Sequence, residues 1–480
     1  MRRYFRFPAL AIALLLAAAS PAYCAKRMVF AHYMLANQDY QGDSSQKAKI
    51  ASYEREILQA RALGIDGFAL NAGGWLHQPW YIEYAAQMFE AAARLDDGFK
   101  LMFSADMCCG NSAADVVDMM RRFAGNPRYA RVYFRCHGEP VLTTFAGSSK
   151  GVAFWRQVRA DLATGAHPST SVEPRVLAQA RAAPSNAPMR IFLVPAFFWG
   201  GERPGRAAVQ RGFGEWRSVI DGAFYWGIAG VPGSGGPLDQ LRSSQAYASV
   251  LHAGRRLYMA PVTLQFWGAN ANRYYEYSGA EGMRRMWMDA IEKTHPGWVE
   301  IITWNDFIEG TYISPIDDPN RYPNANYLTQ SGIPLGTPHY FHSHQAAGDL
   351  MRFFIEWYKT GHKPPITHDT VYWFYRTQTF HYDAGAPPVA HRYGPVADRI
   401  YITANLIAPA RLVVRLGAHS WTVRFRAGST DASVPFIPGV TPEFTLMRHG
   451  RVLVTDKGRD AIQEAPRWND YYDSSGEMSR

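Results

Sequence analysis

Eight short apolar segments that favour β-structure recur between residues 28 and 303, and segments with helical periodicity lie between them. Eight strands alternating with helices favour a (β/α)8 barrel over a doubly wound sheet, which has fewer strands and a glycine-rich dinucleotide-binding turn after the first. No such turn follows Tyr33. We therefore expect an α/β fold with a barrel over residues 25–362. Its predicted strands are 28–33, 67–70, 100–104, 140–144, 191–195, 223–226, 257–260 and 299–303.

The pattern changes after Lys363-Pro364-Pro365, where short strand-like segments follow one another without a helix-length segment. This pattern predicts an antiparallel β-sandwich over residues 367–465. Residues 466–480 are interpreted as a polar tail that is frayed from Asn469 onward. The expected strands of the sandwich are 371–374, 399–402, 411–415, 421–425 and 444–446.

The amino terminus has the pattern of a secretory leader. Arg2, Arg3 and Arg6 precede an apolar run over residues 9–19, and small residues follow it. An apolar run of this length is too short to cross a bilayer, which needs about 20 residues. We therefore predict a signal peptide over residues 1–24, no membrane span, and a secreted or periplasmic protein.

The cysteine content limits the possible disulfides. Removal of the leader leaves Cys108, Cys109 and Cys136, an odd number in an oxidising compartment. These residues allow at most one disulfide and leave one free thiol, and the sequence leaves open whether any pair forms.

Charge and residue type exclude several classes of partner. The net charge of +9 would permit a nucleic-acid ligand, but the Lys and Arg residues are scattered, so no nucleic-acid partner is expected. His339, His342 and His344 match no zinc-binding spacing. We predict no metal and no cofactor. Aromatic residues make up 14% of the chain, which suits either core packing or stacking against sugar rings.

Catalytic groups of a barrel enzyme lie where the strands end at the carboxyl side. After the eighth predicted strand, Asp306 and Glu309 lie three residues apart. A glycosidase needs such a pair, one carboxylic acid to protonate the leaving oxygen and one carboxylate to activate water or attack carbon. The alternative is that the two residues cap the next turn. Asp66, near the start of its strand, is as well suited to a structural role as to catalysis. The polar and aromatic residues expected to bind substrate are His32, Tyr33, Asn71, Asp106, Trp199, Trp226, Gln265, Trp267, Trp304 and Asn305.

Five motifs in order resemble glycoside hydrolase family 71, the α-1,3-glucanases or mutanases, and the resemblance covers roughly residues 28–375. They lie at 30–34, 64–71, 103–107, 140–145 and 303–309. The resemblance implies inverting endo-hydrolysis of α-1,3-glucan, a polysaccharide substrate, with Asp306 and Glu309 as the catalytic pair. Similarity to the related endo-α-mannosidases implies that Asp306 is the base and Glu309 the acid. The chain departs from the family pattern at Ile308-Glu309-Gly310 and at Ala146. These departures concern the details of the sugar-binding subsites and the identity of the polymer, not the catalytic pair.

Two alternative functions stay open at this point. One is a related glycosidase that cleaves another α-linked glycan, such as an α-mannan, because the motif specifies the carboxylates more firmly than the sugar. The other is a carbohydrate-binding barrel without turnover, which would keep Trp199, Trp226 and Trp267 but should have lost Asp306 or Glu309. Both carboxylates are present in the sequence.

Overall fold

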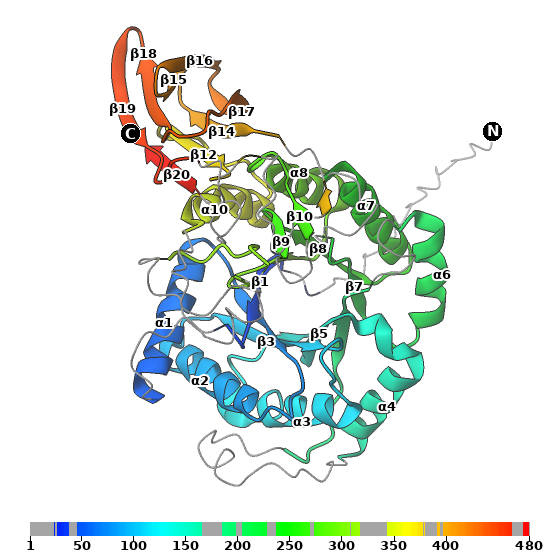
Figure 1. Ribbon diagram of the computed structural model, residues 1–480. Helices are drawn as coiled ribbons and strands as arrows, with labels where there is room; N and C mark the ends of the chain where they lie inside the picture. The colour runs from blue at the N-terminus through cyan, green and yellow to red at the C-terminus, as the bar shows by residue number, and fades with distance from the viewer. Residues whose placement is uncertain are drawn as a thin grey trace, which may run out of the picture.

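The computed structural model describes residues 24, 26–37, 46–165, 185–197, 204–227, 237–268, 273–307, 309–316, 343–377, 379, 391–393, 397–462 and 474–479. Within this part of the chain, eight parallel strands form the centre of the larger unit (Figure 1). All eight predicted strands are confirmed to within a few residues. They are β1 (Met28–Met34), β2 (Gly67–Ala72), β3 (Lys100–Asp106), β5 (Glu139–Phe145), β6 (Phe192–Pro195), β7 (Gly222–Phe224), β8 (Leu257–Val262) and β11 (Trp298–Ile301).

The parallel strands are joined edge to edge in the order β6-β5-β3-β2-β1-β11-β8-β7. At the remaining edge, between β6 and β7, a parallel bridge links Ala196 to Phe224. The N–H of Phe197 also donates to the carbonyl of Phe224 at 3.0 Å. The α/β class predicted from the sequence is confirmed.

Helices surround the strands on the outside (Figure 1). The strands are buried along nearly their whole length, which explains why they are continuous apolar runs in the sequence. The capping box of Ser112 and Asp115 begins α3. The helices are α1 (Gln46–Ala62), α2 (Trp80–Leu95), α3 (Ala113–Phe123), α4 (Gly151–Thr164), α6 (Arg206–Trp216), α7 (Pro237–Ala253), α8 (Glu281–Asp289) and α10 (Gln345–Thr360), with short turns at Pro127–Tyr129, Gly147–Lys150 and Ala290–Thr294.

Two antiparallel sheets follow α10. One has the order β17-β14-β12-β20 and the other β16-β15-β18-β19. Side chains of both sheets form one hydrophobic core, in which Trp373 stacks on Phe444 with ring centroids 4.4 Å apart. The strands are β12 (Thr370–Tyr375), β14 (Arg399–Leu406), β15 (Ala410–Leu416), β16 (His419–Phe425), β17 (Gly428–Pro435), β18 (Glu443–Arg448), β19 (Arg451–Lys457) and β20 (Ser474–Ser479).

The prediction of a frayed tail is wrong for its last residues. Ser474–Ser479 form β20, which pairs along its whole length with β12, and Met478 is buried in the core. The strands β17 and β19 were also not predicted. Three further short strands, β9 (Phe266–Gly268), β10 (Arg273–Tyr275) and β13 (His391–Tyr393), make a small separate sheet, and β4 (Arg135–Cys136) pairs with β5.

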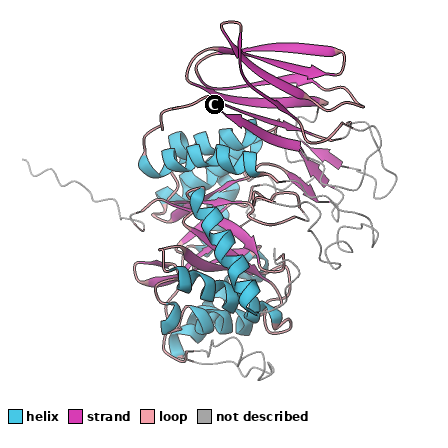
Figure 2. Cartoon of the chain, turned by 90° about the vertical axis from the view of Figure 1, so that its left-hand side faces the viewer, coloured by secondary structure: helices cyan, strands magenta, loops and turns pink. Residues whose placement is uncertain are grey.

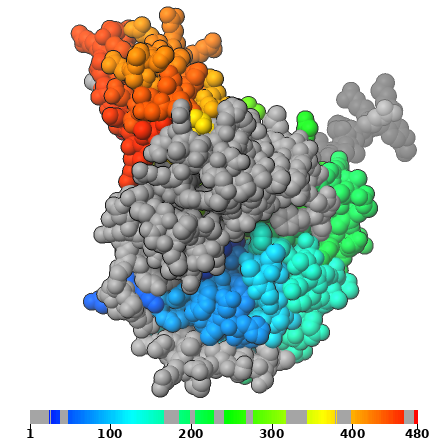
Figure 3. Space-filling view, in the orientation of Figure 1, coloured from blue at the N-terminus to red at the C-terminus, as the bar shows by residue number. Residues whose placement is uncertain are grey.

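The C-terminal sheets form a lobe on one side of the larger unit, next to α10 and α8 (Figures 2 and 3). Tyr372, Phe374 and Tyr401 pack into the same hydrophobic cluster as the parallel strands. Across this contact, Arg284 of α8 forms an ion pair with Asp431 of β17. The two parts therefore share buried apolar surface as well as charge contacts.

A disulfide joins Cys24 to Cys136, and Cys108 and Cys109 are free thiols. The pairing corrects the cysteine count made from the sequence, which assigned Cys24 to the removed leader. Among the described residues, no helix is both long and apolar enough to cross a membrane.

Candidate active site

The segment after β11 carries the two candidate catalytic carboxylates. The backbone N–H of Asp306 donates to Thr303 Oγ1 at 2.8 Å, and Oδ1 of Asp306 accepts from the backbone N–H of Glu309 at 3.2 Å. Asp306 is 7% exposed and Glu309 is partly exposed. Asp306 thus closes the turn to Glu309, as the capping alternative predicted, at the carboxyl end of a parallel strand, where barrel enzymes carry their catalytic groups.

Further contacts hold this segment in place. The hydroxyls of Thr303 and Thr311 lie 3.0 Å apart, and the N–H of Thr303 donates to the carbonyl of Thr311. From the end of β8, Gln265 donates through Nε2 to the carbonyl of Gly310 at 3.3 Å. Gln265 therefore contacts the candidate catalytic loop directly. Its buried Oε1 accepts no hydrogen bond from the described residues.

Asn305 joins the catalytic segment to the end of β1. Its Oδ1 accepts from the N–H of Met34 at 2.7 Å, and its Nδ2 donates to the carbonyls of Met34 and Asn37 at 3.1 and 2.7 Å. The side chain is 1% exposed. Because both ends of the amide are bound to backbone, the prediction that Asn305 binds substrate is corrected here. Asn305 instead connects the segment after β11 to the segment at the end of β1.

Tyr33 and Trp304 are also corrected. Side chains alternate between the two faces of a strand, so Tyr33 points to the opposite face from His32, toward the helices. Its hydroxyl donates to Oε1 of Glu56 on α1 at 3.0 Å, and the indole N–H of Trp304 donates to Oε2 of the same carboxylate at 2.9 Å. Both aromatic side chains are fully buried. They lie in the layer between strands and helices, where a substrate does not reach them.

His32 lies in the interior of the ring of strands. Its Nδ1 is 2.7 Å from Oε1 of Glu300 on β11, and its ring meets that of Trp226 edge to face at 4.7 Å. Nε2 of His32 and Oε2 of Glu300 have no hydrogen-bond partner in the described part of the chain. Sequence reasoning missed Glu300, although a carboxylate inside the apolar run Val299-Glu300-Ile301 is a signal that was available.

Asn71 and Asp106, at the ends of β2 and β3, lie next to each other in the structure. Nδ2 of Asn71 donates to Oδ2 of Asp106 at 3.3 Å, and Oδ1 of Asp106 accepts from the N–H of Cys108 at 2.9 Å. Burial, followed by the neighbouring Asp106 carboxylate, raises the pKa of the Cys109 thiol to about 12. The Asp106 carboxylate therefore sits beside a neutral thiol at physiological pH.

Other sequence candidates fall elsewhere. Trp199 and the side chain of Trp267 lie outside the described residues, as do His339 and His342. Nδ1 of His344 lies 2.7 Å from the carbonyl of Tyr312, and its ring stacks on that of Tyr312.

Asp66 has a structural role. Its Oδ2 accepts from the N–H of Val29 at 2.9 Å, and its Oδ1 accepts from Nζ of Lys359 at 2.7 Å. These contacts connect β1, β2 and α10 near the starts of the strands, which is the end of the ring opposite to Asp306. The structural alternative for Asp66 is therefore the correct one.

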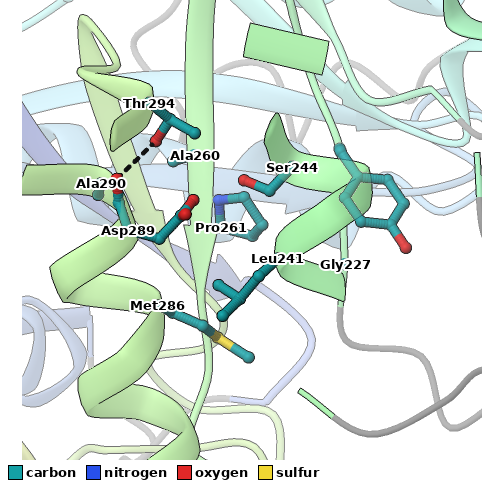
Figure 4. Close-up of a pocket in the computed structure, with 10 residues that line it drawn as sticks. Gly227, Leu241, Ser244, Ala260, Pro261, Met286, Asp289, Ala290 and Thr294 are labelled. Atoms are coloured by element: carbon teal, nitrogen blue, oxygen red, sulfur yellow. Dashed lines mark hydrogen bonds between the residues drawn. The ribbon is translucent and has the colours of Figure 1, made fainter. Parts of the chain in front are cut away.

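A separate pocket lies on the flank of the strand ring, between β8 and the helices α7 and α8 (Figure 4). Asp289, at the end of α8, turns its carboxyl group toward β8, and Gln245 donates to its Oδ1. Burial raises the pKa of the Asp289 carboxyl. Neither Asp306 nor Glu309 lines this pocket, so it is distinct from the candidate active site.

Comparison with known proteins gives relatives along almost the whole chain. The sequence is 26% identical over 451 residues to the glucan endo-1,3-alpha-glucosidase agn1 of Schizosaccharomyces pombe, covering 93% of each chain. It is 24% identical over 450 residues to a mutanase of Penicillium rubens, covering 90% of this chain and 84% of that protein. A solved GH99 endo-alpha-mannosidase from Bacteroides thetaiotaomicron has a TM-score of 0.48 and 11% identity, covering 69% of this chain and 97% of that one. The model of glycosyl hydrolase family 71 matches residues 25–478, and the chain belongs to this family.

Proposed function

We propose that this glycoside hydrolase is a secreted enzyme that cleaves α-1,3-glucan internally with inversion, using Asp306 and Glu309. The observation that carries the proposal is the position of the pair, on a braced turn directly after β11 at the carboxyl end of the parallel strands. The relatives from Schizosaccharomyces pombe and Penicillium rubens, named as a glucan endo-1,3-alpha-glucosidase and a mutanase, support the choice of polymer.

Inversion needs one carboxylate to activate a water and one carboxylic acid to protonate the leaving oxygen, with the carboxyl groups about 6.5–9.5 Å apart. We assign Asp306 as the base and Glu309 as the acid. One oxygen of Asp306 accepts the N–H of Glu309, which fixes the orientation of the carboxylate.

The substrate-binding residues we retain are those on the interior or at the strand ends. Asn71 and Asp106 form a hydrogen-bonded pair suited to sugar hydroxyls, and Trp226 supplies a flat apolar ring. His32 and Gln265 each keep a buried polar atom without a partner among the described residues. Trp199 and Trp267 stay as candidates from the sequence.

We infer a three-part architecture for the full chain. The ring of parallel strands with its helices is a (β/α)8 barrel from residue 25 to about 362, and the two antiparallel sheets form a β-sandwich that extends from 367 to Ser479 rather than ending at 465. A leader that ends before Cys24 directs the protein to the periplasm or outside the cell. The disulfide of Cys24 with Cys136 suits such an oxidising compartment.

The roles of the two carboxylates are tested by D306N and E309Q. Each should lower turnover roughly 10²- to 10⁴-fold with the fold intact by circular dichroism. Only E309Q should recover rate on a substrate with an activated leaving group, because such a group needs no protonation. Azide should restore activity to D306N alone, since a small anion can replace the missing base but cannot donate a proton. Undiminished turnover in D306N would refute the assignment.

Stereochemistry and polymer are tested separately. NMR of the first product formed from an α-linked substrate should show the β-anomer, and an initial α-anomer would contradict inversion. A panel of α-1,3-, α-1,4- and β-1,3-glucans and α-mannan should give depolymerisation of the α-1,3-glucan. Cleavage of α-mannan alone would favour the endo-mannosidase alternative.

A further inference from the structure

Glu56 is a buried carboxylate that sequence reasoning did not select. It lies on α1 and is 2% exposed, far along the chain from the candidate catalytic segment. Its two oxygens accept from two different side chains, the hydroxyl of Tyr33 and the indole N–H of Trp304. One carboxylate on a helix thus connects the first strand to the loop that follows the eighth.

A carboxylate suits this place because its two oxygens can accept from two different donors. An indole N–H buried without an acceptor would cost about 1–3 kcal/mol. An apolar residue at position 56 would leave both donors without this acceptor, and an amide could accept from only one of them through its carbonyl. Burying a polar group is costly unless it is hydrogen-bonded, and here both oxygens of Glu56 accept hydrogen bonds from donors in defined positions.

Trp304 connects this carboxylate to the catalytic turn. Its ring packs on Phe68 with centroids 5.3 Å apart, and its backbone N–H donates to the carbonyl of His32 at 2.7 Å. Its carbonyl accepts from the N–H groups of Ile313 and Ser314. Two residues later comes Asp306. The ring and the backbone of Trp304 are thus held together in one arrangement, two residues before Asp306.

We propose that Glu56 is a positioning residue for Asp306, and that it acts by holding the indole of Trp304. The inference rests on the proposed function, because it takes Asp306 as a catalytic group. Glu56 touches neither substrate nor reacting atoms in this role. It sets the direction of the chain at the catalytic turn through one hydrogen bond, while the bond from Tyr33 keeps the carboxylate itself in place.

The test compares E56Q and E56M with a matched control on the same helix. E56M keeps the length of the side chain but removes both acceptors, whereas E56Q keeps one acceptor for Trp304. Because small misplacements of catalytic groups have large effects on rate, E56M should lower kcat roughly 10- to 100-fold with KM within about threefold. E56Q should retain most of the kcat. The control E54Q, which alters a partly exposed carboxylate on α1, should match the wild type.

A double-mutant cycle with W304F separates positioning from general stability. In W304F no indole N–H remains, so adding E56M should change kcat by less than about threefold, far below its effect in the wild-type background. Activity is measured at 25 °C on protein shown to be folded, with a soluble α-1,3-linked oligosaccharide. Independent effects of the two substitutions would overturn the proposal, as would a change confined to KM or to thermal stability.

Measuring D306N in the same assay separates a failure of the positioning role of Glu56 from a failure of the proposed function. Loss of activity in D306N together with a wild-type kcat in E56M would overturn the positioning role alone. Full activity in D306N would overturn the proposed function and, with it, the role of Glu56.

Discussion

Glu477 should make the stability of the protein depend on pH. It lies on β20, opposite Tyr372 of β12, and shares a hydrogen bond with Asp349 of α10. Burial, followed by the Asp349 charge and this hydrogen bond, raises the pKa of Glu477 from 4.5 to about 7, and Arg352 opposes the shift. The charged and titratable groups that face it are thus Asp349 and Arg352 on α10 and Tyr372 on β12, whose own pKa is raised by burial.

The raised pKa of Glu477 determines how its contribution to stability changes with pH. The folded protein keeps the proton on Glu477 over a range in which the unfolded chain has released it. The contribution of Glu477 to stability is therefore greatest below pH 4.5 and falls as pH rises to about 7. The full shift would correspond to about 3 kcal/mol at about 1.4 kcal/mol per unit. Because Glu477 is partly exposed, solvent screening reduces this to about 1–2 kcal/mol.

The substitution E477Q tests this reasoning, because an amide can donate to Asp349 at every pH. The free energy of unfolding in urea, measured from pH 4.5 to 7.5, should fall by about 1–2 kcal/mol more in the wild type than in E477Q. The control E443Q makes the same change at an exposed residue of β18 and should keep the wild-type slope. A wild-type slope in E477Q, or a variant less stable than the wild type at pH 7.5, would refute the argument.

Three further outcomes are expected. The substitution C136S should lower the free energy of unfolding, measured in urea, by about 2–5 kcal/mol, and an unchanged unfolding midpoint would contradict the disulfide. N-terminal sequencing of exported protein should find a start at or before Cys24, and a later start would contradict the disulfide as well. In native protein at pH 8, iodoacetamide should modify Cys108 faster than Cys109, because burial raises the pKa of Cys109 to about 12. The two rates are measured by mass spectrometry of tryptic peptides, and equal rates would contradict the prediction. Deletion of residues 367–480 should sharply reduce soluble yield, because Tyr372, Phe374 and Tyr401 of these sheets pack into the hydrophobic cluster of the parallel strands. A soluble truncated enzyme with full activity would contradict this expectation.

Much of the fold follows from local sequence. Each parallel strand is covered on both faces, so it is a short continuous apolar run, and eight such runs separated by helical segments predict the α/β class and the strand positions. The strands that were not predicted differ from these in polarity and exposure. β17, β19 and β20 are largely polar and partly exposed, and β20 is a strand because β12 offers it a free edge.

The same distinction applies to the candidate site. The position of Asp306 and Glu309, directly after an apolar run, is visible in the sequence. Tyr33 and Trp304 also follow or end such runs, but the alternation of side chains across the strand and the turn after it sends them to the helix layer. Polarity at a strand end is therefore not enough to identify a substrate contact.

The sequence by itself determined the order of the strands, the class of the fold and the two carboxylates at the end of the eighth strand. Only the tertiary structure decided which residues hold them: Glu56 meets Trp304 across 248 positions of the chain, and His32 meets Glu300 across 268. The physical reason is that burial patterns are local and repeat with the period of a strand or helix, whereas a hydrogen bond between side chains depends on which distant segments the pairing of the strands makes neighbours.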